Sequence, residues 1–238
     1  MNCKICLTLS FFHTILKVSG VVSVKKFPIC AFALLLSVFF IILSVSIIIP
    51  VLARPIYYNQ IENTSLHRIG PYSKEEIKEA YDEVIDYITF RKKDFSCGKL
   101  KFSVSGADHF KDCRNLIGLD LIILLISSIS TIILLLFRKS CNIYLKRLPS
   151  PFYSGVLGIA LLILVGLLSL DGFTFAFILF HKIFFMGKTN WYFDPSTDEI
   201  INYMPESFFL KCAVVIGVSI FLLSALVIFL SIKKRKEN

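Results

Sequence analysis

The chain has 238 residues, of which 55% are hydrophobic and 18% charged, and its formal net charge is +9. Its mean hydropathy of +0.73 excludes an ordinary soluble domain, because the surplus of apolar residues is concentrated in long blocks. The sequence therefore predicts a membrane protein, and the blocks give its organisation in chain order.

Three of the blocks are long enough to cross a bilayer, which takes about 20 apolar residues in a helix. They are Phe27–Ala53, Ile117–Phe137 and Leu210–Ile232. A fourth block runs from Phe152 to Phe185 and would be roughly 50 Å long as one helix, against a hydrocarbon core of about 30 Å. Asp171–Gly172 divides this block. We therefore predict a third span over residues 152–172 and an interfacial segment from residue 173.

Lysine and arginine gather in three segments, residues 1–26, 138–151 and 233–238. These segments hold 12 basic residues and one acidic residue, whereas 14 basic and 16 acidic residues lie elsewhere. Short loops rich in Lys and Arg mark the cytoplasmic side, so we predict both termini in the cytoplasm and residues 54–116 and 173–209 outside. The basic charge then reflects topology and contact with anionic lipid, and it gives no indication of nucleic-acid binding.

The longer outer segment, residues 54–116, is predicted to fold into a small cap. In "GPYSKEEIKEAYDEVIDYI", Ser73 and Glu76 form a capping box, and apolar residues recur at helical spacing from Ile77 to Ile88. The alternation in "KLKFSVS", residues 99–105, predicts a strand.

The second outer segment contains "NWYFDPSTDEIINYMP", in which two short β-like runs flank a turn over Asp194–Asp198. Pro205 and Glu206 then predict the start of the fourth membrane helix. The predicted fold class is an α-helical polytopic membrane protein, with a four-helix transmembrane core and a small extracytoplasmic α+β cap.

Two of the four histidines lie where an apolar segment meets an outer one. His109 precedes the second span and His181 follows the third. Histidine exchanges protons near neutral pH, and ionisable groups at membrane depth are costly enough to suggest function. The alternative is that these rings only anchor helix ends at the interface, as Trp191 could.

Two carboxylates are candidates for a supporting role. Asp112 lies one helical turn after His109 and could orient its imidazole, although an ion pair with Lys111 or Arg114 is an equally good interpretation. Asp171 could hydrogen-bond toward the site or simply end the third span.

The sequence contains no nucleophile-elbow, zinc-protease, phosphate-loop or dinucleotide motif. A zinc site from the two histidines and Glu206 matches no known ligand spacing, and the lone CxxC of Cys3 and Cys6 is a weak metal signal. Cys97 and Cys113 could form a disulfide or remain two free thiols.

Two stretches carry a family resemblance. "FSVSGADHFKDCRNLI" resembles the motif F-S-x-x-E-x-x-H-M-x-D-V-K-x-L-F, and "FHKIFFMGKTNWYFDPSTDEIINYMPESFF" resembles F-H-x-I-F-F, W-x-L-D-P and L-I-x-x-x-P-E-x-F-F. These are motifs of the bacterial lipoprotein intramolecular transacylases, and the likeness covers about residues 50–235. The matching polar and aromatic positions are His109, Asp112, His181, Trp191 and Asp194. The first motif departs from the family at three positions, which are Gly106 for Glu, Phe110 for Met and Cys113 for Val.

The resemblance implies an acyltransferase of the bacterial plasma membrane that acts on its outer face. Its substrates would be the diacylglyceryl-cysteine N-termini of lipoproteins, and membrane lipid would surround it. The enzyme would move the sn-2 acyl chain to the cysteine's α-amino group and give the lyso form. His109 and His181 would act as a base and acid pair, supported by Asp112, Asp171, Trp191 and Asp194, without a cofactor.

Two other functions remain open from the sequence. One is a non-enzymatic four-span protein whose outer cap binds a partner and whose histidines are interface anchors. The other is a related lipid-ester hydrolase that uses the same histidine pair.

Overall fold

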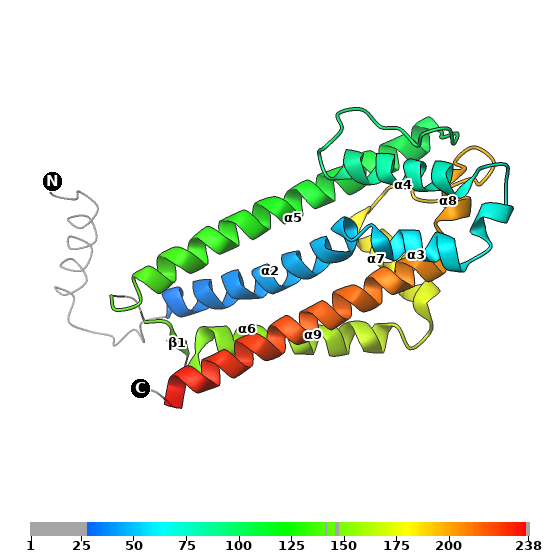
Figure 1. Ribbon diagram of the computed structural model, residues 1–238. Helices are drawn as coiled ribbons and strands as arrows, with labels where there is room; N and C mark the ends of the chain where they lie inside the picture. Colours follow the sequence, from blue (N-terminus) through cyan, green and yellow to red (C-terminus); the bar gives the residue numbers. More distant parts are fainter. Residues whose placement is uncertain (1–27, 141, 146–147, 237–238) are drawn as a thin grey trace, which may run out of the picture.

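The computed structural model describes residues 28–140, 142–145 and 148–236. Among these residues, four helices are long and apolar enough to cross a membrane: α2 (Ile29–Leu52), α5 (Val104–Leu136), α6 (Ser150–Leu168) and α9 (Glu206–Lys236). They lie side by side as a bundle in Figure 1. Helix α2 contacts the other three, and α6 packs on α9. The predicted four-helix membrane core is confirmed.

Small polar side chains take part in the contacts between these helices. Ser37 on α2 donates to Ser130 on α5 over 2.8 Å, and Ser154 on α6 donates to the carbonyl oxygen of Leu35 over 2.8 Å. Large apolar side chains such as Ile126, which is 62% exposed, face outward instead. This arrangement is typical of membrane bundles, where lipid covers the apolar faces and small residues let helices approach closely.

The cap gathers at one end of the bundle from α3 (Pro55–Asn63), the 3-10 turn η1 (Leu66–Arg68), α4 (Lys74–Ile88), α8 (Ile200–Tyr203) and the first turns of α5 (Figure 1). The capping box of Ser73 and Glu76 is present at the start of α4, as predicted. Tyr57 and Tyr81 are almost completely buried, and their rings stack with centroids 3.8 Å apart. The apolar stripe of α4 thus packs into the core of the cap.

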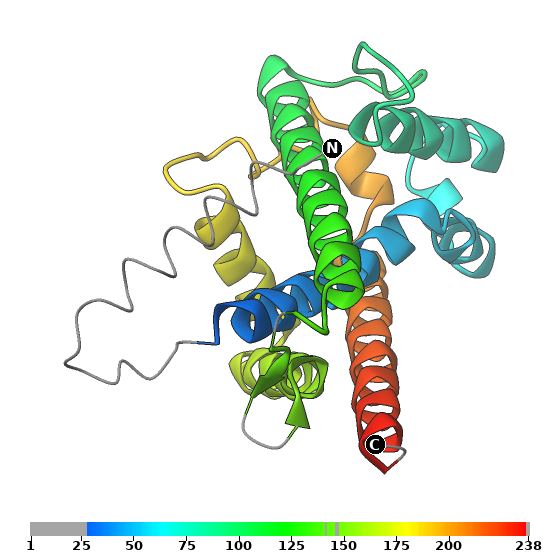
Figure 2. The same cartoon turned by 90° about the vertical axis from the view of Figure 1, so that its left-hand side faces the viewer.

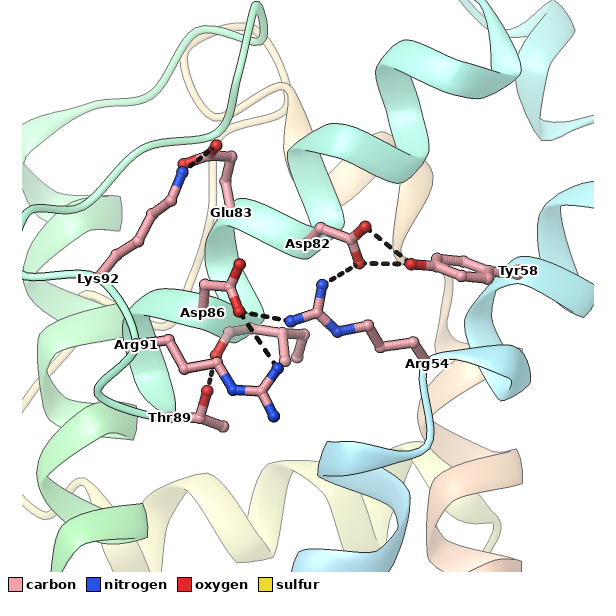
Figure 3. Close-up of polar contacts among 9 residues, drawn as sticks. Arg54, Tyr58, Asp82, Glu83, Asp86, Thr89, Arg91 and Lys92 are labelled. Atoms are coloured by element: carbon pink, nitrogen blue, oxygen red, sulfur yellow. Dashed lines mark hydrogen bonds and ion pairs between the residues drawn. The ribbon is translucent and has the colours of Figure 1, made fainter.

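An arginine joins the cap to the end of α2. Arg54 lies between the C-cap of α2 and the start of α3, and it forms ion pairs with Asp82, at 2.8 Å, and with Asp86 on α4. Figure 3 shows its guanidinium between the two carboxylates, with the Tyr58 hydroxyl donating to Asp82 over 2.7 Å. These charged hydrogen bonds fix α4 over the end of the membrane helix.

The predicted strand in "KLKFSVS" is wrong. Residues 101–103 are irregular, and α5 begins at Val104, well before the apolar block predicted from residue 117. Ser103 caps the helix by accepting the Gly106 N–H over 2.9 Å, while its own N–H donates to Asp198 over 2.8 Å. The N–H and hydroxyl of Ser103 are thus bonded at the start of a helix, and they are not available to pair with a neighbouring strand.

The β-like runs around residues 194–198 also form no strands, although the turn itself is present and the Asp198 N–H donates to the Asp194 carbonyl oxygen over 2.8 Å. Among the described residues, the one strand pair lies away from the cap, in the loop between α5 and α6. There β1 (Tyr144–Leu145) pairs antiparallel with β2 (Leu148–Pro149). The cap is therefore helical.

Helix α9 begins at Glu206, directly after Pro205, as predicted.

The fourth apolar block is divided as the sequence indicates. Helix α6 ends at Leu168 and α7 (Phe173–Phe184) begins after Gly172, whose φ of +102° suits only glycine without strain. In Figure 2, which views the bundle along its length, the yellow α7 lies on one side of α5 and the cap helices α3 and α4 lie on the other. Helix α7 thus leaves the bundle and approaches the cap end of α5.

Several predictions concern residues outside the described ranges. These are the segment 1–26, which is predicted to be cytoplasmic and contains Cys3 and Cys6, the basic residues Lys146 and Arg147, and the acidic residue Glu237.

Candidate active site at the cap end of α5 and α7

His109 and His181 lie together where α7 meets the first turns of α5. Their ring centroids are 6.0 Å apart, and the ring planes are inclined by 29°. Both side chains are buried, with 6% and 7% of their surface exposed. The two predicted histidines therefore come from separate helices to one place, as a shared site requires.

His181 is held in one orientation by its own helix. Its Nδ1 lies 2.7 Å from the carbonyl oxygen of Phe177, one turn earlier in α7. A carbonyl oxygen only accepts, so the Nδ1–H donates, and in the neutral ring Nε2 keeps a lone pair. Burial lowers the pKa of His181, and the hydrogen bond to Phe177 offsets part of that effect. His181 is consequently neutral, with a basic nitrogen, near pH 7.

His109 is enclosed mainly by aromatic rings. Its ring centroid is 4.8 Å from that of Phe185 and 5.3 Å from that of Phe193. Its Nε2 lies 3.5 Å from the Sγ of Cys113, one turn further along α5. Its Nδ1 is buried and has no hydrogen-bond partner among the residues that the structure describes. One nitrogen of this ring is therefore both buried and unpaired among the described residues.

Asp112 positions a loop rather than the His109 imidazole. Its carboxylate accepts hydrogen bonds from Lys188 and, over 2.9 Å, from Asn190. The indole Nε1–H of Trp191 donates to the carbonyl oxygen of Lys188 over 3.1 Å, and its ring stacks on His181 with centroids 4.7 Å apart. Asp112 thus ties the loop after α7 to α5 and holds Trp191 against His181. Neither Lys111 nor Arg114 is its ion-pair partner in the structure.

The other two predicted carboxylates lie apart from the histidines. Asp171 is exposed in the break between α6 and α7. Asp194 shapes its turn, because its carboxylate accepts the Ser196 N–H over 2.9 Å and the Ser196 hydroxyl over 2.7 Å. Among the contacts of the described residues, neither carboxylate reaches His109 or His181.

Sequence reasoning missed Asp198. This carboxylate is 4% exposed and accepts both the N–H and the hydroxyl of Ser103 at the start of α5. A β-carbon at residue 106 would overlap the carboxylate and approach its Cγ to 2.9 Å, so Gly106 makes room for it. The only available signal was the pattern D-P-S-T-D, in which the second Asp follows the turn.

The thiols and candidate metal ligands give two further results. Cys97 and Cys113 are free, so the disulfide alternative is wrong. In the part of the chain that the structure describes, no cluster of three or more His, Cys, Asp or Glu side chains is arranged to hold a metal ion.

Comparison with known proteins gives a consistent result. The family model of lipoprotein intramolecular transacylase Lit matches residues 32–209. The in meso structure of the membrane-integral lipoprotein intramolecular transacylase Lit from Bacillus cereus aligns with a TM-score of 0.78 and 25% identity, over 88% of this chain and 97% of that chain. A histidine-to-arginine variant of that protein aligns with a TM-score of 0.73 and 25% identity, over 88% and 94%. The comparison with curated proteins gave no match.

Proposed function

The chain belongs to the lipoprotein intramolecular transacylase family, and from this membership we propose that it is a membrane acyltransferase acting on lipoprotein N-termini. In the proposed reaction, the sn-2 acyl chain leaves the glycerol of the diacylglyceryl-cysteine and is transferred to the α-amino group of the same cysteine. The donor ester and the acceptor amine are parts of one molecule, so holding them together supplies much of the rate through effective concentration.

The observation that carries the mechanism is the 6.0 Å separation of the two buried imidazoles. His181 is the general base, because its Nδ1–H is bonded to Phe177 and its Nε2 keeps a lone pair. The α-amino group has a pKa of about 7.7–8.0, so a neutral imidazole can take its proton as the nitrogen attacks the ester. His109 donates its N–H proton to the departing glycerol oxygen, and the proton that His181 takes from the amine is then passed to His109, so that both rings end neutral.

The location of the pair suits a lipid ester. Helix α7 is apolar, and Phe180, Ile183 and Phe184 beside His181 are each about half exposed. These side chains offer an apolar surface to acyl chains, while the polar ion pair of Asp112 on α5 with Lys188 in the loop after α7 lies near by. We place the site at the outer membrane face, with both termini in the cytoplasm, because Arg138, Lys139 and Lys233 lie at the opposite end of the bundle.

The test uses the protein in lipid vesicles with a synthetic diacylglyceryl lipopeptide that has a free amine. Transfer leaves the total mass unchanged and moves one acyl chain to nitrogen, which tandem mass spectrometry locates. His109→Ala and His181→Ala should each slow transfer by about a hundredfold to ten-thousandfold, the usual cost of losing a general acid or base. His67→Ala in η1 is the matched control and should retain the rate.

Two results would contradict the proposal. Loss of one whole acyl chain would identify a hydrolase. Unchanged transfer in either motif variant would mean that the histidine concerned only anchors a helix end.

A further inference from the structure

The loop after α7 carries an amide side chain beside the two histidines. Asn190 comes directly before Trp191, whose ring stacks on that of His181 with centroids 4.7 Å apart. The Asn190 Nδ2 donates to the Asp112 carboxylate over 2.9 Å, and Asp112 lies one turn after His109 on α5. Asn190 therefore lies between a residue that contacts one imidazole and a residue one turn from the other.

The bond to Asp112 fixes which way round the Asn190 amide lies. An ionised carboxylate only accepts hydrogen bonds, so the amide nitrogen faces Asp112 and the amide oxygen faces elsewhere. That oxygen, Oδ1, is buried and has no hydrogen-bond partner within the described ranges, as is also true of the His109 Nδ1. Buried polar atoms are normally hydrogen-bonded, so an unpaired oxygen in this loop calls for an explanation.

Holding the loop in place does not account for this oxygen. The tether to α5 consists of the ion pair between Lys188 and Asp112 and of the N–H that Asn190 gives to the same carboxylate. Both bonds use donors, and neither uses the Asn190 Oδ1. The oxygen is thus an acceptor that the folded loop itself does not need.

We propose that the Asn190 Oδ1 accepts a hydrogen bond from the α-amino group of the lipoprotein substrate and holds that group for attack. This inference rests on the proposed function, because the acceptor amine must lie at the histidine pair. A neutral primary amine has two N–H bonds and one lone pair. In the proposed reaction one N–H meets the Nε2 of His181 and the lone pair meets the ester carbonyl carbon. The second N–H is the donor that Asn190 lacks.

An uncharged acceptor suits the form of the amine that reacts. A carboxylate in this place would favour the ammonium ion, which has no lone pair and cannot attack the ester. An amide oxygen binds the neutral amine without that penalty. The contact also makes a primary amine the preferred acceptor, because a hydroxyl group or a tertiary amine has no second N–H to offer to Asn190.

The experiment measures binding to the full chain in detergent by titration calorimetry. The probes are two diacylglyceryl lipopeptides whose sn-2 chain is joined by an ether, so that no transfer occurs. One has a free α-amino group and the other an N,N-dimethyl group. At about pH 9, above the α-amino pKa of about 7.7–8.0, both are neutral and only the first has N–H bonds. Asn190→Ala should weaken binding of the free amine by about tenfold and leave binding of the dimethyl probe unchanged.

Lys188→Ala is the matched control, because it also removes one bond to Asp112 and should change the affinity for both probes by the same factor. Asn190→Leu fills the space of the amide without an acceptor and should reproduce the selective loss, so the test does not depend on one variant folding. Equal factors for the two probes in the Asn190 variants would mean that Asn190 only ties the loop to α5, and this would overturn the proposal.

The binding result is separate from the transfer assay. A selective effect of Asn190 in a protein that transfers no acyl chain would retain the amine contact and reject the transferase. Intact transfer with equal factors for the two probes would reject the amine contact alone.

Discussion

The ring of Trp191 stacks on that of His181, with centroids 4.7 Å apart and planes inclined by 30°. Trp191 is the only tryptophan of the chain. Its fluorescence therefore comes from one ring in direct contact with the proposed general base, and it reports both the charge of that base and the position of the loop after α7.

The first prediction concerns pH. Burial lowers the pKa of His181, so the ring stays neutral until the pH falls below the ordinary histidine value of about 6.5. A protonated imidazole quenches a stacked indole more strongly, so Trp191 emission should fall in a transition centred below pH 6.5. Transfer activity should fall further in the same range, because the base is lost as it gains its proton, in addition to the decline at higher pH that protonation of the substrate amine (pKa about 7.7–8.0) causes. His181→Gln should remove the fluorescence transition, and a midpoint above 6.5 would contradict the effect of burial.

The second prediction concerns the loop tether. Asp112→Ala removes the acceptor for both Lys188 and Asn190, so Trp191 should lose its fixed position and its emission should shift to the red. We expect the transfer rate to fall by roughly tenfold. This loss is smaller than the loss expected for a histidine variant, because Trp191 would be misplaced while both imidazoles remain present. Lys188→Ala leaves the Asn190 bond intact and should cost less than Asp112→Ala. Equal rates for the Asp112 variant and the unaltered protein would remove Asp112 from the site.

The third prediction concerns Gly106. In Gly106→Ala the new methyl group would overlap the buried Asp198 carboxylate, and overpacking of this kind typically costs about 1–3 kcal/mol. Thermal unfolding in detergent should show a lower midpoint. The matched control is Gly166→Ala on α6, where a β-carbon meets no atom within 4 Å. Since alanine is a better helix former, the control should be neutral or slightly stabilising. A Gly106 variant as stable as this control would mean that Asp198 moves aside without cost.

The fourth prediction concerns orientation. Single cysteines at Ser65 and Ser196, both exposed at the cap end, should react with a membrane-impermeant thiol reagent applied to intact cells. A cysteine at the exposed Ser140, beyond the other end of α5, should react only after the cells are opened. The basis is the excess of lysine and arginine in the sequence segments 1–26, 138–151 and 233–238. The reverse pattern would invert the topology.

The membrane helices were predictable because an apolar block of about 20 residues or more is long enough to span the bilayer as a helix. The capping box of α4 was predictable because it depends only on residues close together in the sequence. The strand expected in residues 99–105 was wrong because alternation over a few residues says nothing about a partner strand. Instead of pairing with a strand, Ser103 in this segment donates hydrogen bonds to Asp198, which lies far along the chain.

The candidate site also has features that the sequence could predict and features that it could not. His109 and His181 stand out from the sequence, because a titratable ring beside an apolar run is unusual. The partners of Asp112 could not be read from its neighbours, because Lys188 and Asn190 belong to a distant loop whose approach depends on the path of α7.

Helix α5 is continuous from Val104 to Leu136, a rod of roughly 50 Å that carries His109 near one end and membrane-spanning turns at the other. The height of His109 above the lipid is therefore tied to how this rod matches the thickness of the bilayer. His181 is carried by α7, which is separated from its membrane helix by the break at Gly172. A change in membrane thickness should therefore shift His109 and His181 by different amounts. The acyl-chain length of the surrounding lipid would then change the distance between the two rings.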